Sequence, residues 1–145
     1  KMPGISAPTI KKAMKKVLKD LACDKRELSI LFTDDTHIRE LNRRYRLKDR
    51  PTNVLAFPMS DDSCEVESGM LGDIVISVDT AMRESERTGE TPEETACRLL
   101  IHGILHLIGY DHERSDKDAK IMTKEEARLG MLIREGKNGS TCRKH

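Results

Sequence analysis

Three of the five histidines in this chain occur within residues 102–112, in the stretch HGILHLIGYDH. His102 and His106 are four residues apart, so on a helix their side chains share one face, with Cβ atoms about 6 Å apart. Gly109 follows them, and glycine is the residue that most often ends a helix in a left-handed conformation. The chain can turn there and bring His112 back toward the other two imidazoles.

Three imidazoles that converge in this way could bind a metal ion. A zinc ion with three protein ligands keeps one tetrahedral position open, which is typical of catalytic rather than structural zinc. We therefore predict that His102, His106 and His112 hold one divalent ion. Zn²⁺ is the first candidate, but Ni²⁺ or another divalent metal is also possible because imidazole accepts several of them. His37 and His145 are predicted to be ordinary surface histidines.

The residue after the first histidine limits the chemistry of this site. The spacing His-x-x-x-His-x-x-Gly-x-x-His equals that of the metzincin proteases, in which a glutamate after the first histidine acts as general base. Gly103 occupies that position here and has no side chain. The pattern therefore indicates a hydrolytic metal site without the peptidase base. Either another group transfers the proton, or the reaction depends more on the metal ion and on cationic side chains.

Length and composition predict one globular domain. The 145 residues are 35% charged and 37% hydrophobic, without an apolar run of the ~20 residues that a membrane helix needs. We expect a single domain over residues 1–136 and a flexible basic tail at 137–145. The first residues lack the apolar core of a signal peptide, which favours a cytoplasmic location and reduced cysteines. No membrane association is expected, and the oligomeric state stays open.

Charge is distributed unevenly along the chain. Residues 1–50 contain 14 Lys and Arg against 7 Asp and Glu, whereas residues 51–145 contain 12 against 18. A basic half is compatible with a nucleic-acid-binding face, and equally with two solvated helices.

The hydrophobic periodicity predicts an α+β fold with the histidines at the end of a central helix. Apolar residues recur at helical spacing in 6–22, 34–47, 79–89, 91–108 and 115–135, and short apolar runs indicate strands at 27–33, 53–57 and 70–78. Helix starts are expected at Ser6, at Asp79, at Thr91 with Glu94 in a capping box, and at Ser115. These strands predict a small mixed sheet, with the first two parallel if they are adjacent.

Three stretches of the sequence resemble the YbeY family of bacterial endoribonucleases and rRNA maturation factors. HGILHLIGYDH resembles the family's His-Gly-x-x-His-x-x-Gly-Tyr-Asp-His signature. LNRRYRLKDRPTNVLAFP at 41–58 and LGDIVIS at 71–77 resemble two further family segments. The one departure is Ala56, where the family usually has serine.

The resemblance implies a fold and an activity. The fold would be zincin-like, with a mixed four-stranded sheet, although the residues themselves indicate only three strands. His102, His106 and His112 would bind zinc, and Arg46 would be the functional arginine facing the metal cleft. The activity would be metal-dependent cleavage of single-stranded RNA, in maturation of the 16S rRNA 3′ end and in ribosome quality control. The expected partners are therefore rRNA and the ribosome or its small subunit.

Other residues near these motifs have open roles. Arg46 could pair with a phosphate through two parallel hydrogen bonds, whereas Arg43, Arg44 and Lys48 are expected to form a solvated helix face. Asp111 either orients an imidazole or only shapes the turn, and Asp73 either contacts the site or simply begins a strand; the general base is not assigned. We expect Tyr110 to pack, and Pro51, Thr52 and Asn53 to shape the loop after Arg46.

Two alternative functions remain. A ribosome-associated assembly factor with a mainly structural metal would bind ribosomes without cleaving RNA. A metallohydrolase of another substrate, such as a peptide, is also compatible with three histidines, although Gly103 counts against a peptidase.

Overall fold

The computed structural model of the chain describes residues 6–23, 26–46, 52–58, 69–110 and 115–142. Within these ranges helices and strands form an α+β arrangement, in which the last three elements are helices. The elements are α1 (Ala7–Asp20), β1 (Arg26–Thr33), α2 (Asp35–Arg46), β2 (Val54–Pro58), β3 (Gly69–Ser77), α3 (Val78–Thr88), α4 (Pro92–Leu107) and α5 (Asp116–Cys142).

The sheet is mixed, and β3 is its central strand in the order β1-β3-β2. β1 pairs with β3 in parallel, and β2 pairs with β3 in the antiparallel direction. The first two strands of the chain are therefore not neighbours, and the parallel pairing considered for them is formed by β1 and β3 instead. The fourth strand implied by the family resemblance is not found among the described residues, which agrees with the three strand patterns in the sequence.

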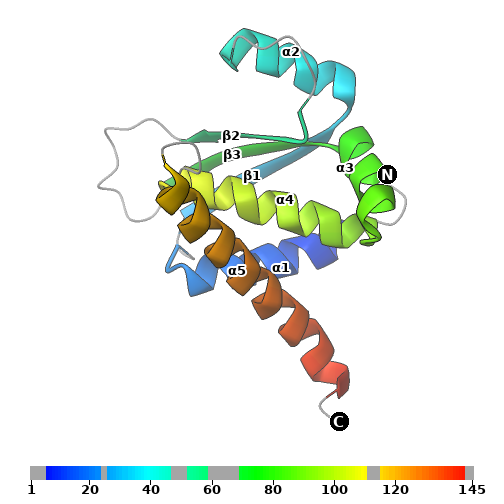
Figure 1. The fold of residues 1–145 in the computed structure, drawn as a ribbon, viewed down its shortest axis with the longest axis vertical. Coiled ribbons are helices and arrows are strands. Elements are labelled where there is room, and N and C mark those ends of the chain that lie inside the picture. Colours follow the sequence, from blue (N-terminus) through cyan, green and yellow to red (C-terminus); the bar gives the residue numbers. More distant parts are fainter. Residues whose placement is uncertain (1–5, 24–25, 47–51, 59–68, 111–114, 143–145) are drawn as a thin grey trace.

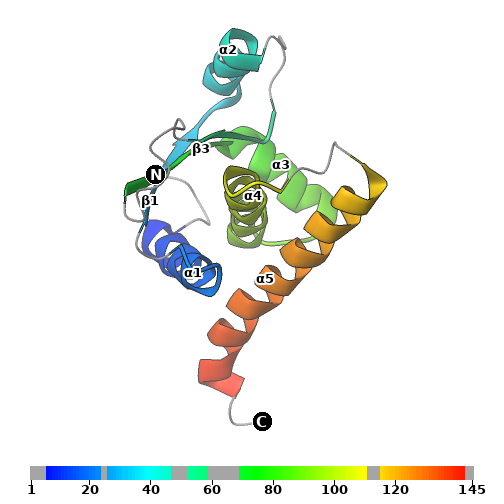
Figure 2. The same cartoon turned by 90° about the vertical axis from the view of Figure 1, so that its left-hand side faces the viewer.

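The helices cover the two faces of the sheet unequally (Figure 1). α2 lies alone on one face, while α1, α4 and α5 gather on the other (Figures 1 and 2). The side chains of β3 alternate accordingly, since Ile74 and Ile76 pack in the larger core and Val75 packs in a smaller one with Ile38 of α2.

α4 is the central helix of the larger core. Apolar residues occupy most of its faces, and its neighbours include α1, α3, α5, β2 and β3. Leu100, Ile104 and Leu105 are fully buried there. A helix that is apolar on most sides has to lie inside the protein, as the sequence predicted.

Most predicted helix starts are confirmed. Ser6 and Thr91 are N-caps, with Glu94 completing the capping box, and the Ser115 hydroxyl accepts a hydrogen bond from the Asp118 amide at 3.0 Å. The prediction for α3 was wrong by two residues. Its N-cap is Ser77, whereas Asp79 lies in the first turn and accepts from the backbone amide of Asp35 at 3.0 Å.

α5 continues as a helix to Cys142, beyond the predicted domain end at residue 136. The division of the chain into a domain and a tail stays a prediction. In the part of the chain that the structure describes, no helix combines the length and hydrophobicity needed to cross a bilayer.

Candidate metal centre

His102 and His106 lie on one face of α4, as their spacing predicts. Their ring centroids are 4.7 Å apart and the ring planes are inclined by 80°. Both residues are partly exposed on a helix whose other faces are largely buried. Two imidazoles are thereby held side by side at the protein surface by a rigid element.

The helix ends as the glycine predicts. Gly109 adopts φ +111°, its amide donates to the carbonyl of His106 at 3.1 Å, and the amide of Tyr110 donates to the carbonyl of Leu105 at 2.9 Å. These two bonds form a Schellman motif, which satisfies the last carbonyl groups of α4. Tyr110 then packs against the larger core, as expected. The helix therefore ends one residue after the second histidine, at Leu107.

Gly103 has a structural role where α4 packs against β3. The residue is buried, and a Cβ atom built on it would lie 2.9–3.3 Å from the side chain of Ile74 on β3. The absence of a side chain therefore allows the helix to approach the sheet closely. Even the Cβ atom of a glutamate would crowd Ile74 here, so the peptidase base has no room at this position.

Glu126 of α5 is the residue that the sequence analysis missed. Its carboxylate contacts Nδ1 of His102. A carboxylate only accepts hydrogen bonds, so this contact favours a proton on Nδ1, which in the neutral ring leaves the lone pair of Nε2 for a metal ion. The sequence does contain a signal, because Glu126 lies four residues after Met122 and three before Leu129, both buried. A lone carboxylate within an apolar helical stripe needs a partner.

The remaining predicted ligand lies outside the described residues. His112 and the adjacent Asp111 belong to the segment 111–114, so the three-histidine prediction stays a prediction. Within the residues that the structure describes, no three His, Cys, Asp or Glu side chains are close enough to hold a metal ion together. The two described histidines nevertheless fit such an ion, because they share a face of α4 and the Glu126 carboxylate contacts Nδ1 of His102, the usual arrangement of a metal-binding imidazole.

Arg46 is the last residue of α2, and only its backbone is described. α2 and α4 lie on opposite faces of the sheet (Figure 1), so Arg46 and the histidines come from different layers. Arg43 and Arg44 form the solvated helix face that was expected, since both are exposed and both pair with Glu40. Lys48 and Pro51 lie outside the described residues.

Asp73 does not lie with the histidines. It is exposed on β3 beside Phe57 of β2. Side chains alternate along a strand, so Asp73 shares the α2 face with Val75, whereas Ile74 faces α4. This placement separates Asp73 from the described histidines by the thickness of the sheet. His37 forms local hydrogen bonds, with Thr33 through Nδ1 at 2.8 Å, as expected of a surface histidine.

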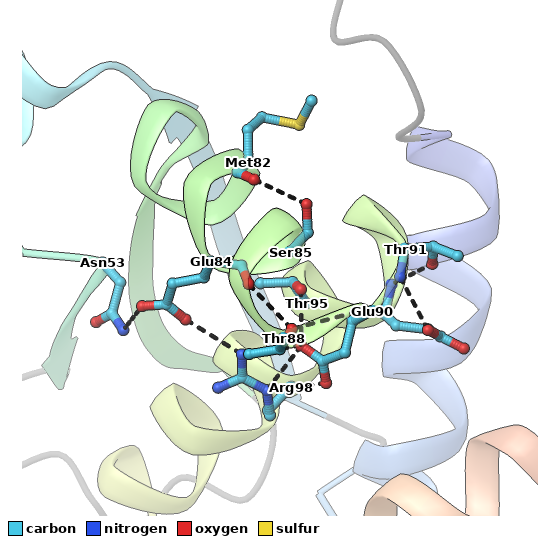
Figure 3. A network of polar contacts seen from close by, with 10 residues as sticks. Asn53, Met82, Glu84, Ser85, Thr88, Glu90, Thr91, Thr95 and Arg98 are labelled. Atoms are coloured by element: carbon cyan, nitrogen blue, oxygen red, sulfur yellow. Dashed lines mark hydrogen bonds and ion pairs between the residues drawn. The ribbon is translucent and has the colours of Figure 1, made fainter.

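A polar network fixes α4 one turn before His102 (Figure 3). The Arg98 guanidinium donates to Glu90 at 3.0 Å and to Glu84 of α3 at 3.1 Å. Glu84 in turn accepts from the Asn53 amide at 2.9 Å. The Arg98 hydrogen bonds are the main cause that lowers the pKa of Glu90, against a smaller opposing effect of burial. Asn53 therefore connects the start of β2 to the helix that carries the histidines.

A cavity of about 540 Å³ adjoins this region between α1, α4 and α5. Cys97 and Ile101 of α4 line it, together with Glu126 and residues of the other two helices. Four glutamates and two arginines contribute to its wall. An excess of carboxylates disfavours phosphate groups, so this cavity does not suit a nucleic-acid backbone.

Comparison with known proteins identifies the family. The family model described as "Endoribonuclease YbeY" matches residues 4–132. The protein named endoribonuclease YbeY from Persephonella marina is 48% identical over 119 residues, covering 82% of this chain and 78% of that protein. Its namesake from Geobacter metallireducens is 44% identical over 135 residues, covering 91% of this chain and 90% of that protein.

A solved structure has a similar fold. The solution structure of TM1509 from Thermotoga maritima superimposes with a TM-score of 0.65 and 27% sequence identity. The match covers 97% of this chain and 90% of TM1509. The family model spans Arg46, all three clustered histidines and Glu126. This chain therefore belongs to the YbeY family of endoribonucleases.

Proposed function

We propose that this endoribonuclease depends on one divalent metal ion held by His102, His106 and His112, with zinc as the first candidate. The observation that supports the proposal is the arrangement of the first two residues: both imidazoles share one face of α4, and the Glu126 carboxylate contacts Nδ1 of His102. Carboxylate–histidine pairs of this kind are usual around protein-bound metals.

The chemistry follows from the residue types. A bound divalent ion would act as a Lewis acid toward a phosphoryl oxygen. Arg46 would bind the phosphate through two parallel hydrogen bonds, which a lysine cannot imitate. Gly103 contributes no proton transfer because it has no side chain and faces β3.

We further propose that the substrate is single-stranded rRNA, in 3′-end maturation of 16S rRNA and in ribosome quality control. The enzyme would work in the cytoplasm, on the ribosome or its small subunit. Support comes from the sequence motifs around Arg46 and the histidines, and from membership of the family. Single-stranded RNA also suits recognition through exposed phosphates, to which an arginine can bind.

Demetallated protein reconstituted with Zn²⁺ tests the proposal. We expect the reconstituted enzyme to cleave single-stranded RNA, to leave duplex RNA and a peptide library intact, and to lose activity on renewed metal removal. Arg46→Ala should keep bound metal but lose at least about 10²-fold in cleavage rate, the usual effect of removing one donor to developing charge. His106→Ala should lose both metal and cleavage.

Three results would count against the proposal. A His106→Ala preparation that cleaves as well as the wild type would point to a contaminating nuclease. Ribosome binding without metal-dependent cleavage would favour the assembly-factor alternative. Cleavage of peptides but not RNA would favour the metallohydrolase alternative.

A further inference from the structure

We propose that Glu126 is a positioning residue of the metal centre: it fixes the tautomer and the ring orientation of His102 from a second helix. The inference rests on the proposed function, because it assumes that His102 binds a metal ion. Glu126 itself is not proposed as a ligand. It acts through the imidazole, and it connects α5 to the metal-binding face of α4.

The first argument is the position of the carboxylate. Met122 and Leu129, on the same side of α5, are 1% and 0% exposed, so this side faces the interior. The Glu126 side chain is 26% exposed and that of His102 is 30% exposed. A carboxylate is costly at a position of this kind unless it is hydrogen-bonded, and His102 supplies the hydrogen bond.

The second argument is the specificity of the pairing. Neighbouring Glu125 pairs with Arg128, which also binds Asp20 of α1 and so joins α5 to α1. Glu126 points to a different place, and in the described part of the chain no lysine or arginine lies within ion-pair distance of it. Two adjacent glutamates thus have separate tasks: one joins helices through an arginine, and the other holds an imidazole.

The third argument concerns what the contact does to the ring. A neutral imidazole carries its proton on either nitrogen, and only the other nitrogen can bind a metal ion. The carboxylate retains the proton on Nδ1, so Nε2 is ready to bind, and the hydrogen bond limits rotation of the ring. Without Glu126, part of the population would carry the proton on Nε2 and would have to rearrange before metal could bind.

Two substitutions at this position test the inference, with Glu125→Gln as the matched control on the same helix turn. Competition with a zinc chelator measures the Zn²⁺ affinity of each purified full-length protein. We expect Glu126→Ala to weaken the affinity about 10–100-fold, the usual effect of losing such a partner. Glu126→Gln should lose less Zn²⁺ affinity, because the amide oxygen of glutamine can still accept a hydrogen bond from Nδ1 of His102. Glu125→Gln should bind like the wild type.

A second readout does not depend on metal. ¹⁵N NMR of the histidine rings in the demetallated proteins reports which nitrogen of His102 is protonated. The wild type and Glu125→Gln should show the proton on Nδ1, whereas Glu126→Ala should show a mixture of both tautomers. Circular dichroism of each protein checks that α5 is still folded, so that a loss of affinity is assigned to the contact itself.

The outcomes separate this inference from the proposed function. Wild-type affinity and an unchanged tautomer in folded Glu126→Ala would overturn the positioning role and leave the metal site intact. A wild-type protein that binds no divalent metal at all would overturn both. Weakened affinity in Glu126→Ala, partly rescued in Glu126→Gln, would support both.

Discussion

The two helices that carry the predicted site residues, α4 and α2, are embedded in the protein very differently. α4 bears His102 and His106, and it contacts three other helices and two strands of the sheet, namely α1, α3, α5, β2 and β3. α2 ends in Arg46 and stands alone on the opposite face (Figures 1 and 2). A small cluster around Ile38 and a set of hydrogen bonds at Asp35 join it to the rest.

This difference separates two tasks of the proposed enzyme. Metal ligands require fixed geometry, and a helix packed on most sides provides it. A residue that binds substrate phosphate needs a position at the surface, which an outer helix provides. The comparison predicts that damage to α4 affects folding and metal binding together, whereas damage to α2 affects RNA cleavage while metal binding persists.

The largest effect is expected from Gly103→Glu, which would recreate the peptidase motif on α4. The new side chain would meet Ile74 of β3 and bury a carboxylate without a partner. We expect a loss of more than about 3 kcal/mol in the free energy of unfolding, measured by urea denaturation, and no peptidase activity.

Gly130→Glu is the matched control for this change. A Cβ atom at Gly130 would meet only the end of the Arg134 side chain, at 3.7 Å, so there is room for the same substitution on α5. It should be neutral or stabilising by up to about 1 kcal/mol, because glycine is a poor helix former and Glu-Arg pairs four residues apart are favourable. A stable Gly103→Glu protein with peptidase activity would contradict the assigned orientation of α4.

An intermediate effect is expected from Ile38→Ala on α2. Ile38 is fully buried between α2 and the sheet, against Leu55 and Val75. Removing its side chain should cost about 2–4 kcal/mol of unfolding free energy, measured by urea denaturation. RNA cleavage should fall, because α2 positions Arg46, whereas the Zn²⁺ affinity of the folded protein should be unchanged.

Leu31→Ala is the control, since Leu31 is 46% exposed on β1 and should contribute less than about 1 kcal/mol. If Ile38→Ala lowered metal affinity as much as it lowered cleavage, the two helices would not act independently. The distinction between a metal-binding layer and a substrate-binding layer would then be lost.

Local sequence signals predicted the elements of the site well. A spacing of four residues was sufficient to place His102 and His106 together, and Gly109 was sufficient to predict the helix end. The cap of α3 was harder, because Ser77 and Asp79 are both good N-cap residues. Asp35, far away in the sequence, contacts both of them: its amide donates to Asp79, and its carboxylate accepts from the Ser77 hydroxyl.

Long-range relations were not predictable in this way. Periodicity indicates that a strand exists but not which strand it pairs with, so the central position of β3 could not be derived. The reason for Gly103 required knowledge that Ile74 lies against it. Glu126 and His102 are separated by 24 residues and by a turn, and no helical spacing relates them. The roles of Asn53 and Arg98 in one network are likewise visible only in three dimensions.

The smallest predicted effect concerns Arg98, which joins α4 to α3 one turn before His102. Arg98→Met keeps an apolar stem of similar length but removes the guanidinium from Glu84 and Glu90. The Arg98 side chain is 42% exposed, so solvent screening reduces the effect, and we expect a loss of about 1 kcal/mol at pH 7. Arg43→Met is the control, because Arg43 pairs with a glutamate on the exposed face of α2. This substitution should change the free energy of unfolding by only about 0.3 kcal/mol.

The effect of Arg98→Met should depend on pH with a defined sign. Arg98 lowers the pKa of Glu90 below the ordinary value of 4.5, so the folded state binds the proton less readily than the unfolded state. The resulting stabilisation is present above about pH 4.5 and is lost as the pH falls through the lowered pKa. Urea denaturation at pH 7 and at pH 3 should therefore show a difference between wild type and variant that shrinks in acid. A difference that stays the same at pH 7 and pH 3 would contradict the assignment of this stabilisation to the ion pair between Arg98 and Glu90, since protonation of Glu90 should remove it.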